Sequence, residues 1–290
     1  MDFEVVLTAV GLMIGLGVTL STVLAVANRK LYVYEDPRIG QVDQMLPGTN
    51  CGACGQPGCR AFAEKLVVGE TAPGQCTVSA EEARESIAGF LGVDVGGDEK
   101  RVARLACAGG SHVARQRAAY VGEATCRAAN LVAGGGKGCA WGCLGLGDCM
   151  VVCDFEAITM NPVALPVVDE DLCTACGDCV EICPKDLFSL HPVSHRLWVA
   201  CKNLAFGDEA EDECEVACTA CARCVADAPE GLARMENNLV VVDYSKNEQA
   251  HAGIIERCPT GAIVWLDGRR GVLRGRHAKP IIRHEALPLG

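Results

Sequence analysis

The chain has 290 residues, a formal net charge of −11, 20 cysteines and 33 glycines, but only 4% aromatic residues. The acidic balance argues against nucleic-acid binding, because phosphate contacts need a basic face. The length allows two domains, but so few aromatic side chains cannot fill one large apolar core. Small lobes must therefore be held together by disulfides or by metals.

The N-terminus predicts a membrane anchor. Residues Val5 to Ala27 contain no charged residue and are long enough for the roughly 20-residue helix that crosses a bilayer. The alternative is a signal peptide, because Ala25-Val26-Ala27 resembles a cleavage site. However, Asp2 and Glu4 stand where a signal peptide carries basic residues, and the apolar run is too long for one. We therefore expect a retained transmembrane helix.

Two basic residues, Arg29 and Lys30, follow this apolar run directly. By the positive-inside rule they place the rest of the chain on the cytoplasmic side of the inner (cell) membrane, after a single crossing. The cysteines agree with this side, because thiolates that bind metal require a reducing compartment and disulfides an oxidising one.

The first cysteine group lies in LPGTNCGACGQPGC, where Cys51, Cys54 and Cys59 precede Cys76 in a C-x2-C-x4-C-x16-C pattern. Its glycines let the backbone curl around a [4Fe-4S] cube and turn amides toward the sulfurs. The pattern therefore predicts a [4Fe-4S] module, and zinc remains an alternative on spacing alone.

A short helix and a linker are expected after this module. Ser79 and Glu82 predict a capping box for a helix that reaches about Leu91. The glycines at 92, 96 and 97 then indicate a linker. The four-cysteine module is therefore expected to be separate from the later parts of the chain.

The region from Cys139 to Pro184 contains two cysteine quartets, and the second has the C-x2-C-x2-C-x3-C-P spacing of bacterial ferredoxins. In that pattern one loop aims three thiolates at one cube, while the fourth cysteine binds the neighbouring cube. The first quartet departs from the pattern, with x3 and x5 in place of x2 and x2, and with Asp154 where the second has Pro184. Zinc is again the alternative, but zinc ribbons do not string so many cysteines together before a terminal C-P. The expected ligand sets are Cys173, Cys176, Cys179 and Cys153 for one cluster, and Cys139, Cys143, Cys149 and Cys183 for the other.

A second ferredoxin-like unit lies in CTACARCVADAPEGLA and ERCPTGAI. Cys218, Cys221 and Cys224 form its triad, and the distant Cys258 is the expected fourth ligand. Imidazole can replace a thiolate at a cluster, but His251 has no thiolate beside it and is interpreted as a surface residue. We expect the fold to persist around one vacant cluster site, where Ile254 and Ile255 supply apolar contacts in place of the cube by packing on the strand Leu239 to Val242. The positions that have lost their cysteines hold Ala228, Glu248, His251 and Ile254.

Four cysteines remain outside these patterns. VARLAC and HRLWVAC are two strand-like runs that end at Cys107 and Cys201, and each is followed by one more cysteine, Cys126 and Cys214. These two segments flank the ferredoxin core in the sequence, and their ends could lie together in the fold. We assign the four to a fifth [4Fe-4S] cluster, so that groups of four use all 20 cysteines. The alternative is four unrelated thiols, since free cysteine is among the most buried residue types.

Two further stretches carry no catalytic signal. Residues 134–138, GGGKG, lack the spacing and the hydroxyl of a phosphate loop, and no G-x-G-x-x-G follows a strand. We therefore expect neither a nucleotide site nor a catalytic set. From Arg269 the tail is basic, which predicts solvated disorder. Docking to anionic lipid or to an acidic protein is the alternative for this tail.

The charge-free N-terminal helix, the LPGTNCGACGQPGC module and the ferredoxin core, in that order, resemble the B subunit of the Rnf complexes over most of the chain. The resemblance implies a membrane-bound oxidoreductase that passes electrons between reduced ferredoxin and NAD and couples the flow to export of Na+ or H+. It implies an iron–sulfur electron conduit with membrane and flavin-bearing subunits as partners and soluble ferredoxin as the electron donor. Nothing in the spacing itself shows ion pumping.

The expected fold class is α+β, with an N-terminal transmembrane helix, a small four-cysteine iron–sulfur module and two ferredoxin-like units. Short hairpins are expected in these units, at Ala157 to Met160 and at Leu187 to Leu190. The expected function is that of the electron-input subunit of an Rnf-type translocase, with five [4Fe-4S] clusters. One alternative is a membrane-tethered polyferredoxin that reduces a redox sensor or a metalloenzyme, and another is a zinc-stabilised scaffold. The expected segments are residues 1–30 for the anchor, 31–92 for the module, 93–215 for a ferredoxin-like domain with two clusters and the bracketing site, 216–268 for a second unit with one cluster, and 269–290 for the basic tail.

Overall fold

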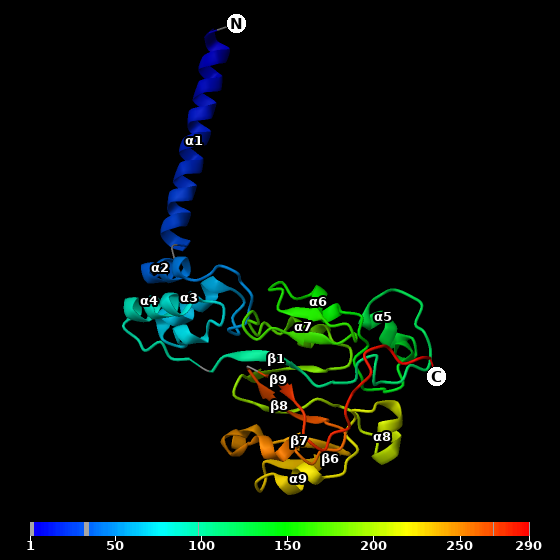
Figure 1. Cartoon of the computed structure of the whole chain (residues 1–290). Coiled ribbons are helices and arrows are strands. Elements are labelled where there is room, and N and C mark those ends of the chain that lie inside the picture. Colours follow the sequence, from blue (N-terminus) through cyan, green and yellow to red (C-terminus); the bar gives the residue numbers. More distant parts are fainter. Residues whose placement is uncertain (1–2, 32–34, 98, 269, 290) are drawn as a thin grey trace.

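The computed structural model describes residues 3–31, 35–97, 99–268 and 270–289. The long helix α1 (Phe3–Leu31) stands apart from the other elements, which together form the body of the protein (Figure 1). Its segment Val10–Leu31 is, among the described residues, the one helix long and apolar enough to cross a membrane. The hydroxyls of Thr19 and Thr22 donate to carbonyls one helical turn earlier, at 2.6 and 2.7 Å. Both polar groups are thus satisfied inside the helix, as an apolar surrounding requires.

A small helical module follows α1. Asp36 caps its first helix by accepting a hydrogen bond from the amide of Arg38, and Pro37 occupies the first turn, where a missing N–H costs little. Val42 and Phe62 are buried at the centre of the module. Its elements are α2 (Pro37–Met45), α3 (Cys59–Val68), the 3-10 turn η1 (Pro73–Gln75) and α4 (Glu81–Leu91).

The central unit combines two short helices with two antiparallel strand pairs. The hairpin expected near residues 157–160 is present as β2 and β3. The hairpin expected at residues 187–190 is wrong, because β4 pairs with β1, so that Leu105 lies opposite Phe188. That pairing joins a strand that precedes the ferredoxin core in the sequence to a strand that follows it. The elements are β1 (Arg101–Leu105), α6 (Asp148–Val151), β2 (Ile158–Met160), β3 (Pro166–Val168), α7 (Asp178–Ile182) and β4 (Phe188–Pro192).

The C-terminal unit is built on the antiparallel sheet β5-β8-β9 and the hairpin β6-β7. The amide of Ala108 donates to the carbonyl of Ala200 at 3.0 Å, so the two strand-like runs that precede Cys107 and Cys201 do meet at their ends. The elements are β5 (Leu197–Val199), α8 (Gly207–Glu213), α9 (Arg223–Asp227), β6 (Ala233–Glu236), β7 (Leu239–Val242), β8 (Ile263–Asp267) and β9 (Gly271–Leu273). Shorter pieces are α5 (Cys126–Leu131), η2 (Ala133–Gly136), η3 (Tyr244–Gln249) and η4 (Ala252–Ile255).

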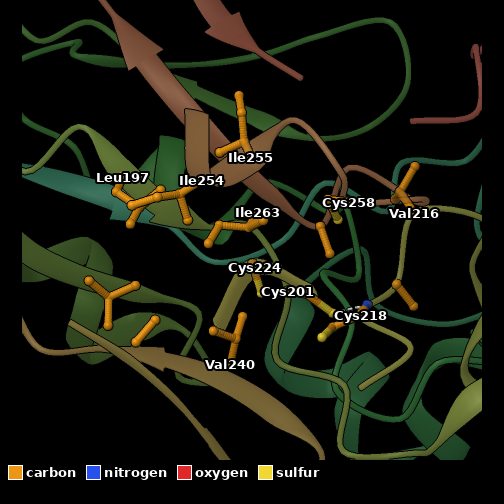
Figure 2. Packing of buried hydrophobic residues seen from close by; sticks show 14 of the residues in the cluster. Leu197, Cys201, Val216, Cys218, Cys224, Val240, Ile254, Ile255, Cys258 and Ile263 are labelled. Carbon is orange, nitrogen blue, oxygen red and sulfur yellow. Dashed lines mark hydrogen bonds between the residues drawn. The ribbon is translucent and has the colours of Figure 1, made fainter. Parts of the chain in front are cut away.

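The apolar core of this unit contains Ile254, which was expected to border a vacant cluster site. Its side chain is 0% exposed and packs in one cluster with Leu197 and Ile263 (Figure 2). Ile255, Val240 and Val242 belong to the same cluster, so the expected replacement of a cluster by apolar contacts is confirmed at this position.

The tail follows the surface of the body. Arg283 donates from Nη1 to the carboxylate of Glu215 and to the carbonyl of His112, at 3.0 Å each, and the amide of Leu287 donates to Ser111 at 2.9 Å. The expected solvated disorder is wrong for residues 270–289, because these cations find acidic and carbonyl partners on the acidic body.

Candidate metal centres

Five cavities, each lined by four cysteines, lie within the body of the protein, and each has about 300 to 390 Å³ of empty space, part of which is open to solvent. We number them in spatial order from the module outward. Cavity I is lined by Cys51, Cys54, Cys59 and Cys76; cavity II by Cys153, Cys173, Cys176 and Cys179; cavity III by Cys126, Cys143, Cys149 and Cys183; cavity IV by Cys107, Cys139, Cys201 and Cys214; and cavity V by Cys218, Cys221, Cys224 and Cys258.

The thiols suit a group larger than one ion. All 20 cysteines are free, so none is used in a disulfide. Among the described residues, no three Cys, His, Asp or Glu side chains are placed to share a single metal ion, as a zinc site with sulfur ligands at about 2.3 Å requires. Four thiols that line one cavity instead suit the four iron corners of an iron–sulfur cube.

Cavity I is shaped by the turn before α3. The carboxamide of Asn50 accepts from the amide of Cys59 at 2.8 Å, and a Cβ on Gly58 would lie 2.8 Å from the same oxygen. Glycine is therefore required where this turn closes. The hydroxyl of Ser79 donates to the Sγ of Cys76 at 3.1 Å, whereas the cap of α4 is Ala80. The expected capping box is wrong, because Ser79 turns to the cavity sulfur instead of the helix amides.

Cavities II and III show a crossed arrangement. Cys149 lies on α6 and Cys179 on α7, and each helix sends its own cysteine to a different cavity. The cysteine that follows each helix goes to the other one, so Cys153 lines cavity II and Cys183 lines cavity III. This is the exchange that the ferredoxin spacing predicts.

The expected grouping differs from the structure at two cysteines. Cys126 was grouped with the bracketing cysteines, but it lines cavity III. Cys139 was grouped with the ferredoxin core, but it lines cavity IV. The two residues have exchanged places, and four cysteines still surround each cavity.

Hydrogen bonds explain why Cys126 lies at cavity III. The carboxylate of Asp148 accepts from the amides of Cys126 and Arg127, at 2.8 and 3.2 Å, and so adds a long-range cap to the N-terminus of α5, whose own N-cap residue is Thr125. Asp148 directly precedes Cys149 in the chain. The start of α5 is therefore held beside the loop that supplies Cys149.

A different set of backbone bonds carries Cys139 to cavity IV. The amide of Gly138 donates to the carbonyl of Arg115 at 2.9 Å, and the amide of Arg115 donates to Glu213 at 3.0 Å. An isolated bridge pairs Ala114 with Cys214. The segment 113–116 thus lies between the residues before Cys139 and the residues before Cys214, and it brings both cysteines together.

Cavities IV and V differ in packing and exposure: a glycine lies close to two sulfurs of cavity IV, whereas one cysteine of cavity V is exposed. A Cβ on Gly109 would lie 2.8 Å from the Sγ of Cys214 and 3.7 Å from the Sγ of Cys107, so only glycine fits between these sulfurs. At cavity V, Cys224 and Cys258 are buried and lie among the apolar side chains of the C-terminal core (Figure 2). Cys221, by contrast, is the exposed cysteine of the chain.

Backbone amides point at several of the sulfurs. The amide of Ala103 donates to the Sγ of Cys173 at 3.4 Å, and the amide of Leu187 donates to the Sγ of Cys183 at 3.4 Å. The Sγ of Cys201 accepts from two amides. Such donors stabilise thiolate charge and are one way in which a protein tunes an iron–sulfur cluster.

Burial makes the cysteine thiols weak acids when no metal is bound to them. It raises the pKa of Cys143 and Cys149 to about 12, and charges on neighbouring cysteines add to the effect. Burial likewise raises the pKa of Cys179, Cys214 and Cys224 to about 12. A positively charged metal centre would favour the thiolate forms and displace the protons.

Two residues at these sites were missed as functional groups. Asp148 was not singled out, although an acidic residue just before a cysteine turn is a possible helix cap. Lys137 was considered only as part of a failed phosphate loop, and its side chain lines cavity IV. Asp148 bonds to amides 21 and 22 residues away, and Lys137 to carbonyls 6 and 28 residues away, so cysteine spacing does not signal either residue.

Two family models match parts of the chain that contain these cysteines. A model described as a putative Fe-S cluster matches residues 46–78, which include the cysteines of cavity I. A model described as a 4Fe-4S binding domain matches residues 165–188, which include Cys173, Cys176, Cys179 and Cys183.

Longer similarity extends over nearly the whole chain. The B subunit of the Na(+)-translocating ferredoxin:NAD(+) oxidoreductase complex of Acetobacterium woodii is 40% identical over 258 residues, which are 89% of this chain and 75% of the relative. The B subunit of an ion-translocating oxidoreductase complex of Methanosarcina acetivorans is 36% identical over 90% of this chain and 98% of its own length. The B subunit of the proton-translocating ferredoxin:NAD(+) oxidoreductase complex of Clostridium ljungdahlii is 38% identical over 89% of this chain and 90% of its own length. The chain therefore belongs to the family of B subunits of the ion-translocating oxidoreductase, or Rnf, complexes.

Proposed function

We propose that this chain is the membrane-anchored iron–sulfur subunit of an Rnf-type ferredoxin:NAD oxidoreductase, and that it relays electrons through five [4Fe-4S] clusters. The observation that carries the proposal is the convergence of all 20 cysteines in five groups of four around consecutive cavities. A cluster bound in each cavity would accept and release one electron at a time. The four cysteines that line each of cavities I to V are the proposed ligands.

The cavities form a single row because a direct contact joins each to the next. The hydroxyl of Thr77, which lines cavity I, donates to the carbonyl of Thr174, which lines cavity II, at 2.6 Å. Cavities II and III share the crossed loops, and the Cys149 and Cys179 thiols are close enough for their charges to interact.

The row continues through two amide–sulfur contacts. The amide of Cys143, at cavity III, donates to the Sγ of Cys107, at cavity IV, at 3.4 Å. The amide of Cys218, at cavity V, donates to the Sγ of Cys201, at cavity IV, at 3.3 Å. Electrons would therefore move along the order V, IV, III, II, I or the reverse, with no branch among these contacts.

The two ends of the row face different surroundings. Cavity I belongs to the module that directly follows α1, while cavity V lies beside α9, at the far end of the body in Figure 1. The exposed Cys221 makes cavity V the accessible end. We infer that soluble ferredoxin delivers electrons at cavity V and that membrane and flavin-bearing subunits accept them near cavity I. With Arg29 and Lys30 in the last turn of α1, the body would lie on the cytoplasmic side of a single crossing.

The test is the composition of the full chain purified anaerobically in detergent. Five [4Fe-4S] clusters require about twenty irons and about twenty acid-labile sulfides per chain, together with copurification of flavin-bearing membrane subunits. A measured content near sixteen irons would mean that one of the five proposed clusters is absent. Stoichiometric zinc without iron would overturn the proposal, and isolation without membrane partners would favour a tethered polyferredoxin.

A further inference from the structure

A half-buried lysine lies between the two middle cavities of the row. The Nζ of Lys137 donates to the carbonyl of Gly109 and to the carbonyl of Cys143, at 2.6 Å each. Cys143 lines cavity III, whereas Lys137 and Gly109 line cavity IV. One ammonium group therefore spans the boundary between cavities III and IV.

The local sequence places this lysine there. Three glycines before it adopt positive φ, at 64°, 65° and 76° for Gly134, Gly135 and Gly136, so the chain turns sharply into the bridge that pairs Lys137 with Gln116. A Cβ on Gly142 would lie 2.9 Å from the Cε of Lys137. A glycine at 142 thus leaves room for the lysine stem.

The charge of Lys137 acts on the sulfurs of both cavities. Its Nζ bonds to the carbonyl of Cys143, a residue of cavity III, and to the carbonyl of Gly109, whose ideal Cβ would lie 2.8 Å from the Sγ of Cys214 in cavity IV. Lys185 lines cavity III and Lys202 lines cavity IV, but their Nζ atoms bond to the carbonyls of Ala140 and Asp186, which line neither cavity. Of these three lysines, Lys137 is the one whose ammonium bonds to residues of both cavities.

Two carboxylates face the same region, Asp148 in the lining of cavity III and Glu213 beside cavity IV. Glu213 pairs through Oε1 with Arg117, but its Oε2 is buried and has no hydrogen-bond partner among the described residues. A Cβ on Gly138 would lie 1.8 Å from that oxygen, so the carboxylate contacts the residue beside Cys139. Lys137 and Glu213 therefore place opposite charges near cavity IV.

We propose that Lys137 raises the reduction potentials of the clusters in cavities III and IV, and so sets how readily electrons occupy the middle of the row. This inference rests on the proposed electron relay. A hop between adjacent cavities oxidises one site by one electron and reduces the other by one. Because each reduced site gains one negative charge, a fixed ammonium beside it stabilises the reduced form more than the oxidised form.

The test is a potentiometric titration of the full chain, followed by electron paramagnetic resonance, in the wild type and in charge variants. In Lys137→Gln the ratio of reduced to oxidised sites III and IV should fall about tenfold at a given potential, which corresponds to about 59 mV for a one-electron couple. Lys137→Arg, which keeps the positive charge, should leave the reduction potentials of sites III and IV at their wild-type values. Glu213→Gln, which removes the opposing charge, should raise the potential of site IV.

The matched control is Lys246→Gln. Lys246 also donates to a backbone carbonyl, that of Glu230 at 3.1 Å, but it lines none of the five cavities. Its loss should leave all potentials unchanged. Iron content measured on each variant separates altered potential from failed assembly, and Glu213→Gln tests the charge effect even if Lys137→Gln loses iron.

The outcomes separate the two proposals. Wild-type protein without reducible iron–sulfur signals would overturn the electron relay itself. Intact clusters whose potentials are the same in the wild type, Lys137→Gln and Glu213→Gln would overturn the role of Lys137 alone. Shifts of the same sign in Lys137→Gln and Glu213→Gln would also reject it, because they would report a structural disturbance instead of charge.

Discussion

The carboxylate of Asp148 accepts a hydrogen bond from the amide of Cys126, with 2.8 Å between Oδ1 and nitrogen. This contact ties the start of α5 to the residue before Cys149, so it brings a cysteine from outside the ferredoxin core to cavity III. Cys139 is the core cysteine displaced to cavity IV. The membership of both proposed ligand sets depends on this arrangement.

The exchange of Cys126 and Cys139 can be tested by single substitutions. Cys126→Ala and Cys183→Ala should weaken the same cluster signal, while Cys139→Ala and Cys214→Ala should weaken a different one, because each pair lines one cavity. Electron paramagnetic resonance that resolves the clusters is the measurement. The exchange is refuted if Cys126→Ala and Cys214→Ala affect the same signal.

Replacing Asp148 should loosen cavity III without removing a ligand. Asp148→Ala deletes the acceptor for two amides at the start of α5, and loss of a helix cap costs about 0.5 to 2 kcal/mol of stability. We expect faster loss of iron from site III in the presence of a chelator. The exposed Asp154, beside Cys153, provides the control Asp154→Ala. Equal iron loss in both variants would contradict the proposed role of the cap.

The hydroxyl of Thr77 should couple the module to the rest of the row. Thr77→Val removes its bond to the carbonyl of Thr174, at a cost of about 0.5 to 1.5 kcal/mol, and we expect slower reduction of site I in rapid-mixing experiments with unchanged iron content. Thr71→Val, which removes a hydroxyl that bonds only within the module, is the control. Identical kinetics in the Thr77→Val variant and the wild type would show that electrons pass between sites I and II by another contact.

Ile254 should be a strong stability determinant of the C-terminal unit. It is 0% exposed in the core where a ferredoxin with two clusters would have a ligand, and truncation of a buried isoleucine costs about 2 to 5 kcal/mol. Ile254→Ala should therefore lower the unfolding midpoint in denaturant. Val272→Ala, at a position 61% exposed, should have little effect. Comparable destabilisation in the two variants would mean that the core does not depend on Ile254.

Iron loading should weaken as the pH falls. Burial raises the pKa of Cys143 and Cys149 to about 12, so these thiols hold their protons at neutral pH in the absence of metal. Iron must displace those protons, and a higher proton concentration opposes binding. Reconstitution of the chain should release protons, and the chain should retain less iron against a chelator at about pH 6 than at about pH 8. Iron retention that increases as the pH falls would be the opposite dependence and would refute this account.

Local spacing was sufficient for the parts of the site that one turn builds. Cys173, Cys176 and Cys179 lie on a single loop and helix. Cys183 follows four residues after Cys179 and lines the neighbouring cavity instead. The four cysteines of cavity I are similarly held by one short module. The apolar α1 was predictable because the length and composition of a membrane span are properties of a continuous stretch.

Long-range contacts decided what spacing could not. Cys126 and Cys139 carry no sequence signal that distinguishes cavity III from cavity IV, and their places depend on Asp148 and on the segment 113–116. The same holds for Lys137, whose ammonium joins the carbonyl of Cys143, six residues later, to that of Gly109, 28 residues earlier, and for the basic tail, whose partners lie on the body. The sequence by itself determined that the cysteines suit iron–sulfur clusters and that the chain begins with an apolar helix long enough to cross a membrane. Only the tertiary structure decided which thiols share a cavity and in which order the cavities lie, because those relations are set by hydrogen bonds between residues far apart in the chain.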